Sequence, residues 1–352
     1  MKSNVLNKMV SAQVKRKKFR ESEWYGIRSL LGYNWAVFYI LLGAREAGKS
    51  YSVTEYFVRK WKTKHIPFYW LRLNEASTKK LLSNNAEKLV DPDLYRRYEL
   101  ELTVKGNVVY DHGEKMATVL ALSTFANDKG VALFDKDFLT NNPEMMYHIC
   151  LDEFQLEKTQ KRQGDICYQF VNQLENLVRS TKEKMRIFLI GNTLEEASDI
   201  LTMFNFIPEE FGRYKLKKKR AVIDYLPPSD AYKKRREGSV ADLLMGEQSN
   251  FTNKIDFDTS LIVKKRLIKP TTTIHFSKTE IYTVWDGRVI AQYNGEKCSS
   301  RIAMRPYIDL AFNQRVRDQI IEIFDNRGFY YKNLITAKKF QKAIREIKPR
   351  KN

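Results

Sequence analysis

The sequence predicts an α/β fold built on a parallel sheet, followed by a smaller α+β domain. Continuous apolar runs, each closed by glycine or by acidic residues, alternate with helical stretches up to about residue 196. Beyond a basic segment with the turn signal Pro227-Pro228, the chain shifts to short β-type runs and two amphipathic stretches. Together these observations predict two compact parts with different architectures.

Each element follows from a local pattern. A short continuous apolar run is typical of a strand buried in a parallel sheet, and such runs occupy 36–42, 67–73, 147–151 and 186–190. Helical spacing marks 50–61 and 166–179, and looser alternation around a glycine predicts a hairpin over 107–121. In the second part, strands are expected at 260–264, 271–276, 281–285 and 289–293, and helices at 309–325 and 333–347. Asp286-Gly287 is a strong hairpin signal between two of these strands.

Residues 43–50 have the form G-x-x-x-x-G-K-S and stand between the first strand and the first helix. Such a loop turns its backbone N–H groups onto phosphates, and the helix N-terminus adds a favourable partial positive charge. Lys49 is expected to reach the β- and γ-phosphates, and Ser50 to supply a hydroxyl to Mg²⁺. The motif therefore predicts a P-loop that binds Mg-ATP. The predicted nucleotide contacts are Gly43, Ala44, Arg45, Glu46, Ala47, Gly48, Lys49, Ser50 and Tyr51.

Two adjacent acids, Asp152 and Glu153, end the apolar strand at 147–151. Beside a P-loop, the first carboxylate is expected to hold Mg²⁺ together with Ser50, and the second to polarise the attacking water. Adjacent acids also occur as plain solvated strand ends. The pair favours the P-loop ATPases with an added catalytic glutamate over small-molecule kinases and GTPases.

Three further polar residues are candidates for contacts at the γ-phosphate. Asn192 would face it as a sensor if the strand at 186–190 lies between the P-loop strand and the Asp152 strand. The alternative is that Asn192 is a turn-former, a role for which Asn is well suited. Arg179 is the best candidate for an arginine finger offered to a neighbouring subunit, although a cation also suits a helix C-terminus. Arg45 can contact phosphate or a neighbouring subunit, or remain a solvated loop charge.

Composition narrows the class of partner. The chain has 352 residues, a formal net charge of +20 and a pI near 9.6, which points to a polyanion, most often nucleic acid. Three cysteines without a CxxC pair argue against a disulfide framework or a zinc site. No apolar run reaches bilayer-spanning length, and the basic N-terminus lacks the apolar core of a secretory signal. We therefore expect a cytosolic protein without a membrane partner.

These motifs resemble one known family. The P-loop, the aromatic–Leu–Arg strand near 69–72, the Asp152-Glu153-Phe154 triplet, the basic turn at 179–186 and the strand end at Asn192 are similar to the encapsidation ATPases of phi29-like small tailed phages. The likeness is clearest over 30–250. Members form homopentameric rings on the portal vertex of a prohead and drive double-stranded DNA inward with ATP. Their C-terminal domain resembles an RNase H-like nuclease without its active site and helps attach the ring to a structural RNA.

The resemblance suggests a division of the chain. We expect a basic N-terminal arm at 1–30, a P-loop ATPase domain of the ASCE type at 31–197, a linker or lid region at 198–255 and an RNA-binding, nuclease-like domain at 256–352. The last part offers several acids, but none follows a strong apolar strand as a metal-binding Asp usually does. We therefore expect a binding module rather than a nuclease. These acids are Asp256, Asp258, Glu280, Asp286 and Asp309.

The leading hypothesis is a ring-forming ATP hydrolase that moves double-stranded DNA into a prohead. By the resemblance, Glu153 is the catalytic base and Arg179 the finger in trans, and the partners are DNA, a prohead RNA, the portal protein and other copies of the chain. Such a protein works in the host cytoplasm, transiently on the prohead, and is absent from the mature virion. Basic runs at 217–220 and 233–236, the turn at 179–186 and the C-terminal tail are candidate surfaces for phosphates. The alternatives are another translocase, such as a helicase or a terminase-like enzyme with a working nuclease, and an ATP-regulated RNA-binding scaffold.

Overall fold

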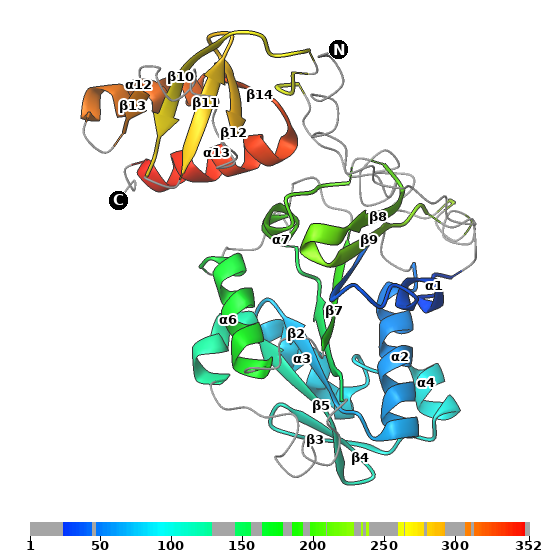
Figure 1. Ribbon diagram of the computed structural model, residues 1–352. Coiled ribbons are helices and arrows are strands. Elements are labelled where there is room, and N and C mark those ends of the chain that lie inside the picture. Colours follow the sequence, from blue (N-terminus) through cyan, green and yellow to red (C-terminus); the bar gives the residue numbers. More distant parts are fainter. Residues whose placement is uncertain are drawn as a thin grey trace. The chain divides into compact units, whose positions relative to one another are not determined.

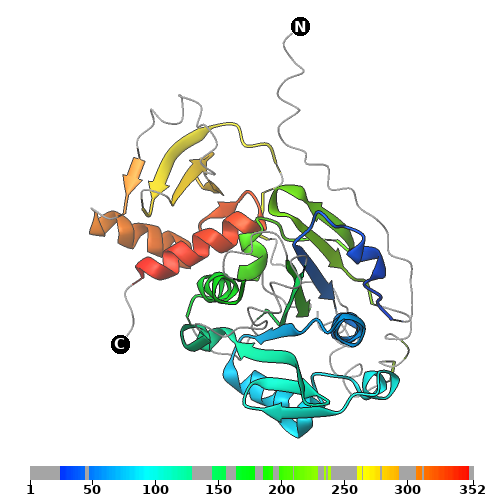
Figure 2. The same ribbon diagram turned by 60° about the horizontal axis from the view of Figure 1, so that its bottom comes forward.

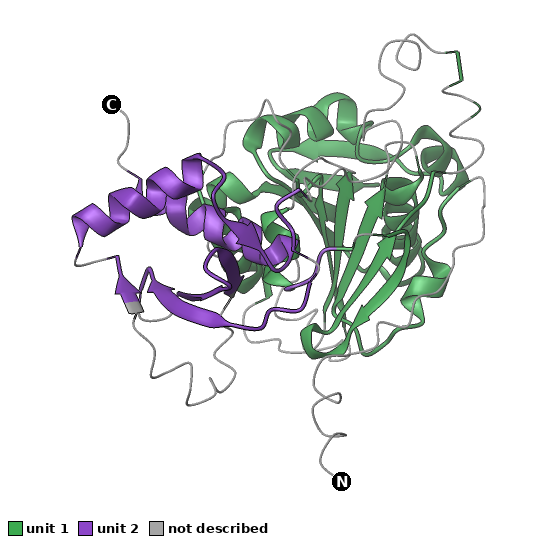
Figure 3. Cartoon of the chain, turned by 90° about the horizontal axis from the view of Figure 1, so that it is seen from above, with its two compact units in different colours: residues 1–204, 208–255 green, residues 205–207, 256–352 purple. Residues whose placement is uncertain are grey.

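The computed structural model describes most of the chain in two compact units (Figure 3). The described residues are 24–43, 47–128, 145–155, 164–178, 185–192, 198–208, 210–228, 234, 237–238, 260–263, 265–277, 280–292, 307–310 and 313–348. Unit 1 comprises residues 1–204 and 208–255, and unit 2 comprises 205–207 and 256–352. Among the described residues, no helix combines the length and the apolar character needed to cross a bilayer.

Unit 1 is built on a nine-stranded sheet in the order β3-β4-β5-β2-β6-β7-β1-β9-β8. The strands from β5 through β2, β6, β7 and β1 to β9 pair in parallel, as the apolar runs predicted, whereas β3, β4 and β8 run antiparallel at the edges. The prediction of an α/β fold with a large parallel sheet is thus confirmed. The strands are β1 Phe38–Gly43, β2 Phe68–Arg72, β3 Leu102–Lys105, β4 Val108–Asp111, β5 Glu114–Ala121, β6 Tyr147–Asp152, β7 Met185–Asn192, β8 Gly212–Leu216 and β9 Ala221–Tyr225.

Helices cover both faces of this sheet. α2 (Lys49–Lys64) and α6 (Ile166–Val178) lie on opposite faces, with the central strands between them (Figures 1 and 2). α6 presents Phe170 and Leu177 to the interior, in agreement with the helical spacing seen in the sequence. The other elements of unit 1 are α1 Arg28–Leu31, α3 Glu75–Ala86, α4 Pro92–Arg97, α7 Asp199–Met203 and the 3₁₀ turns η2 Leu122–Asp128 and η3 Lys217–Lys219.

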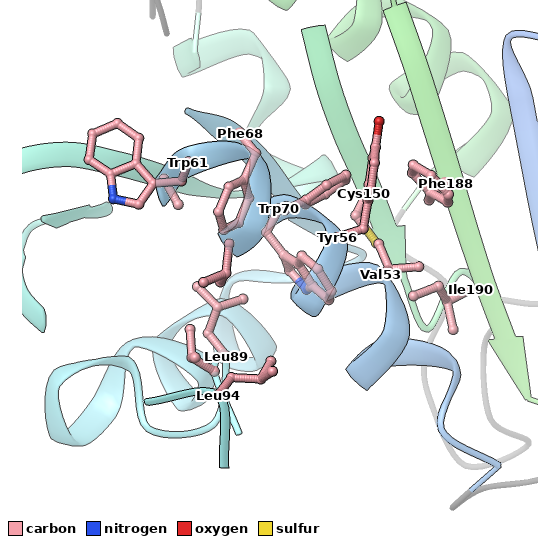
Figure 4. Packing of buried hydrophobic residues seen from close by; sticks show 14 of the residues in the cluster. Val53, Tyr56, Trp61, Phe68, Trp70, Leu89, Leu94, Cys150, Phe188 and Ile190 are labelled. Carbon is pink, nitrogen blue, oxygen red and sulfur yellow. The ribbon is translucent and has the colours of Figure 1, made fainter. Parts of the chain in front are cut away.

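The main core lies between α2 and the sheet. Phe57 of α2 meets the rings of Phe68 and Trp70 on β2 and of Phe188 on β7. Figure 4 shows these three strand residues. Each of these four side chains is at most 2% exposed. Burying aromatic side chains of this size supplies much of the free energy that fixes a helix on a sheet. This packing holds the start of α2 against the carboxyl ends of the strands.

The predicted boundaries of the N-terminal arm and the linker need correction. β8 and β9 belong to the large sheet, because β9 pairs in parallel with β1 and closes with β8 as a hairpin. Between them, Arg213 and Asp224 form a two-bonded ion pair at 2.5 and 2.6 Å that is almost fully buried. Ile27 and Leu30, placed in the arm, are buried in the core of unit 1. Local sequence signals are weak here because these segments are short and interrupted by charged residues.

Unit 2 is a mixed sheet with two helices packed on it. Its strands follow the order β13-β10-β11-β12-β14, with β10, β11 and β12 antiparallel to their neighbours along the chain and β13 and β14 added in parallel. The hairpin expected at Asp286-Gly287 is present, and both residues have positive φ. Instead of a strand at 260–264, the structure has a single bridge between Ile262 and Tyr331. The elements are β10 Pro270–His275, β11 Ile281–Trp285, β12 Val289–Gln292, β13 Tyr307–Asp309, α12 Gln314–Asp325, β14 Tyr330–Tyr331 and α13 Leu334–Ile347.

Candidate nucleotide-binding site

The start of α2, which follows β1, has features that suit an anion. Gly48 precedes α2 with a φ of 84°, in the left-handed region that favours glycine, and no side chain caps the helix. The N–H groups of the first turn of α2 are therefore available to an anion. Lys49 is buried at the same end, where its Nζ donates to the carbonyl oxygen of Gly43 at 2.9 Å. Ala44, Arg45 and Glu46 lie outside the described residues, so their contacts stay predictions.

The acidic pair stands opposite this turn. β6 ends at Asp152, and the hydroxyl of Ser50 donates to Asp152 Oδ1 at 3.3 Å, across 102 positions of the chain. Asp152 is 4% exposed, whereas the side chain of Glu153 is 55% exposed. Glu153 has a φ of 53°, so the chain turns sharply just after the metal-ligand candidate. The two carboxylates therefore have different surroundings, one buried and one open to water.

Arg72, at the end of β2, joins the two carboxylates. Its guanidinium lies 2.9 Å from Asp152 Oδ2 and also contacts a carboxylate oxygen of Glu153. Burial raises the pKa of Asp152, and Arg72 opposes that rise more strongly than Lys49 does. No catalytic role had been predicted for Arg72. The available signal was a cation closing an apolar strand, but only the parallel pairing of β2 with β6 places it at the acids.

Asn192 lies where the sensor hypothesis requires. β7 runs between β1 and β6, with Asn192 in register with Gly43 and Ile190 in register with Asp152. Parallel strands end at the same edge of the sheet, so the three strand ends meet there. The condition on strand order is therefore met, and the choice between a sensor and a turn-former stays a prediction.

Gly191 is required for the shape of the acidic tip. A Cβ added there would lie 2.8 Å from the ring of Phe154 and 3.0 Å from Gln155 Oε1. Phe154 is 1% exposed, and its N–H donates to the carbonyl oxygen of Ile190 at 3.2 Å. The residues directly after Glu153 thus pack onto β7, which fixes the acids relative to Asn192.

A cavity of about 1440 Å³ connects these parts. Its wall also holds Tyr51, whose hydroxyl donates to Asp93 Oδ2 at 2.6 Å; burial and this carboxylate raise the pKa of Tyr51 to about 12. Residues 24–28, which the sequence placed in a basic arm, line the cavity as well. The predicted site residues that line it are Ala47, Gly48, Lys49, Ser50, Tyr51, Asp152, Glu153 and Asn192.

Other predicted residues are placed elsewhere or lie outside the described chain. Arg179 lies outside, as do Asp256 and Asp258. Arg186, at the end of the predicted basic turn, donates to the hydroxyl of Tyr56 at 2.8 Å and to Asn34 Oδ1 at 3.1 Å, so it anchors β7 within unit 1. Among the described residues, no group of three or more His, Cys, Asp or Glu side chains is placed to hold a metal ion.

Comparison with known proteins gives the family. The sequence profile of the podovirus DNA encapsidation protein (Gp16) matches residues 19–288. In fold, the chain is similar to the bacteriophage phi-28 gp11 DNA packaging motor, at 12% identity and a TM-score of 0.64 over 94% of this chain and 99% of that one. It is also similar to the bacteriophage phi-29 genome packaging motor assembly, at 19% identity and a TM-score of 0.60 over 93% of this chain and 100% of that one. No curated protein matches in sequence. The resemblance expected from the motifs is confirmed, and the chain belongs to the podovirus DNA encapsidation protein (Gp16) family.

Proposed function

We propose that the chain is an ATP hydrolase that drives double-stranded viral DNA into a preformed prohead as a ring on the portal vertex. Membership of the encapsidation family makes DNA packaging its process. The proposed ATP hydrolysis is supported by one contact: the Ser50 hydroxyl donates to Asp152 Oδ1 at 3.3 Å, and both residues line the same cavity as Lys49. A phosphate-binding turn and a strand-end carboxylate come together there, as metal-assisted phosphoryl transfer requires.

The donor set suits Mg²⁺. The Ser50 hydroxyl and the Asp152 carboxylate are hard oxygen ligands, and Mg²⁺ is typically held by one or two such groups, the phosphates and water. When bound, the ion would neutralise negative charge on the β- and γ-phosphates. Lys49 would hold the same phosphates, once its Nζ leaves the carbonyl oxygen of Gly43.

Glu153 is the proposed base. It lies next to Asp152 and is the more exposed of the two acids, which suits contact with an attacking water. Its ion pair with Arg72 occupies the carboxylate in this structure. Turning the carboxylate toward an attacking water would release this contact with Arg72. Asn192 would orient the water or the γ-phosphate from the neighbouring strand.

The DNA contacts of the proposed motor are phosphate contacts. Lys217 to Lys219 and Arg220 form an exposed basic turn between β8 and β9, and the chain carries a net charge of +20. Such surfaces bind duplex DNA without reading sequence, and the affinity falls steeply with salt. DNA affinity that stayed flat between low and physiological salt would contradict this part of the proposal.

We infer that residues 256–352 act as a nucleic-acid-binding module, for which a prohead RNA is the proposed ligand. α13 buries Phe340 and Ile344 against the sheet of unit 2 and carries Lys338, Lys342 and Arg345 on its other side. Two of its candidate catalytic acids have structural partners: Glu280 accepts from Tyr282 at 2.8 Å, and Asp286 accepts from the N–H of Lys269 at 2.9 Å. We also propose that unit 2 has an RNase H-like ancestry and that unit 1 is a P-loop ATPase of the ASCE type. The assembled protein is proposed to be a pentamer that contacts the portal protein and sits on the prohead in the host cytoplasm.

The test is ATP turnover with and without duplex DNA on a sample of known oligomeric mass. Glu153→Gln should abolish turnover and leave ATP binding largely intact. Glu55→Gln is the matched control, since Glu55 lines the same cavity but pairs with Arg97 at 2.9 Å. If ATP turnover survives in Glu153→Gln, the assignment of Glu153 as the base is wrong. If duplex DNA does not stimulate ATP turnover by an assembled ring, the result counts against a DNA motor. Nicking of plasmid DNA with Mg²⁺ or Mn²⁺ would instead reveal a working nuclease.

A further inference from the structure

Trp24 lies beside the phosphate-binding turn with half of its side chain exposed. The exposed fraction is 49%, which is unusual for so large an apolar side chain. A Cβ added to Gly48 would lie 3.5 Å from Cε3 of Trp24 and 3.4 Å from the backbone nitrogen of Tyr25. The indole therefore stands directly next to the residue that precedes Lys49, on the wall of the same cavity.

The segment that carries Trp24 is fixed from three directions. The N–H of Tyr25 donates to the carbonyl oxygen of Ala47 at 3.1 Å, and the hydroxyl of Ser52 in α2 donates to the carbonyl oxygen of Tyr25. The hydroxyl of Tyr25 donates to Asp224 Oδ2 of β9 at 2.8 Å. These bonds tie the segment to the loop, to the helix and to the strand beside β1. An aromatic side chain held in this way loses little conformational freedom when a ligand stacks on it.

A nucleotide needs such a surface. A triphosphate on the first turn of α2 leaves its base several ångströms from Lys49, and a flat aromatic ring is a common partner for a base. The cavity that Asp152 and Glu153 line is also lined by Gly48 and by residues 24–28.

We propose that Trp24 is the stacking platform for the base of the nucleoside triphosphate whose phosphates bind at Lys49. The inference rests on the proposed nucleotide site and adds its base-binding end. Stacking favours every base, because each has a π-face. Trp24 thus supplies affinity for nucleoside triphosphates in general, and discrimination between adenine and guanine comes from other groups.

The experiment measures binding of ATP, GTP and inorganic tripolyphosphate, each with Mg²⁺, to the full chain by calorimetry. Trp24→Ala should raise the Kd of ATP and of GTP by a similar factor, roughly 5- to 150-fold. The Kd of tripolyphosphate should change by less than about twofold, because it has no base. Trp24→Phe should restore most of the nucleotide affinity. Tyr168→Ala is the matched control, since Tyr168 is 61% exposed and does not line the cavity.

The outcomes distinguish a failure of stacking by Trp24 from a failure of the proposed nucleotide site at Lys49. Lys49→Ala should weaken all three ligands; if it weakens none, the proposed phosphate site itself is wrong. If Trp24→Ala weakens tripolyphosphate as much as ATP, the indole only supports the loop, and the stacking proposal is overturned. If Trp24→Ala leaves all three Kd values unchanged, it is also overturned; a change in oligomeric mass would then assign Trp24 to a contact between subunits.

Discussion

Arg72 provides the sharpest test of how the acidic tip is held. Replacing it by Met keeps an unbranched apolar stem and removes the charge that faces both carboxylates. Asp152 is 4% exposed, so its charge would then remain in the protein interior without its nearest cation. Removing one partner of a buried ion pair costs about 3–5 kcal/mol of unfolding free energy.

For Arg72→Met we expect a loss of unfolding free energy near the lower end of this range, at about 3 kcal/mol. Asp152 would keep the favourable charge of Lys49 and the hydrogen bond from Ser50 at 3.3 Å. The contact of Arg72 with Glu153 adds little, because the Glu153 side chain is 55% exposed and screened by water. Nearly all of the effect should therefore come from Asp152.

The assay must isolate unit 1, because the two units can unfold separately. Hydrogen exchange of the β6 amides during denaturation reports the opening free energy of the strand that carries Asp152. Arg97→Met is the matched control, since Arg97 also pairs with two carboxylates, Asp93 at 2.7 Å and Glu55 at 2.9 Å, but is 49% exposed. It should destabilise unit 1 far less than Arg72→Met.

A second variant separates charge from packing. Arg72→Met combined with Asp152→Asn removes the stranded charge and should recover about 2 kcal/mol relative to Arg72→Met alone. Equal losses in Arg72→Met and Arg97→Met would refute the reasoning. So would a double variant that is no more stable than Arg72→Met.

Two further predictions concern the surroundings of the site. Gly191→Ala should lower the free energy of unfolding by about 1–3 kcal/mol, because the added Cβ would lie 2.8 Å from the buried ring of Phe154. It should also lower ATP turnover, because the acids would move. Gly32→Ala, whose Cβ would lie 3.7 Å from its nearest atom, is the control for both the denaturation and the turnover measurements, and equal behaviour of the two variants would contradict the packing argument. Burial, with Arg186 and Lys60 nearby, lowers the pKa of His148 to about 3, so only the unfolded chain takes up a proton there as the pH falls below about 6.5. The stability linked to neutral His148 is therefore fully present above about pH 6.5. Below about pH 6.5, the free energy of unfolding of the wild type should fall by about 1.4 kcal/mol per pH unit relative to that of His148→Gln. Denaturation of both proteins at about pH 7.5 and about pH 5.5 checks this, and a stability difference that does not change with pH would count against it.

The sequence by itself predicted the chemistry that we propose for the site. The loop at residues 43–50 and the acids after an apolar strand identified a phosphate end and a carboxylate end, because strand, loop and helix are contiguous in the chain. It also predicted most strands of unit 1 and the helices α2 and α6, since long apolar runs and helical spacing depend only on near neighbours. The helices α3 and α4 were not predicted. Phe154 could be named as part of a motif, but its packing against Gly191 could not.

The tertiary structure alone decided which strand ends meet. Asn192 lies between the P-loop strand and the acid strand, Arg72 reaches both carboxylates, and Trp24 stands over Gly48, through pairings between segments far apart in the chain. The order of strands in a sheet is set by the packing of all its strands and helices at once, so no local pattern contains it. For the same reason β8 and β9 were predicted as a linker. β9 pairs with β1 across a long stretch of chain, and the buried ion pair of Arg213 with Asp224 joins β8 to β9 without any sequence periodicity.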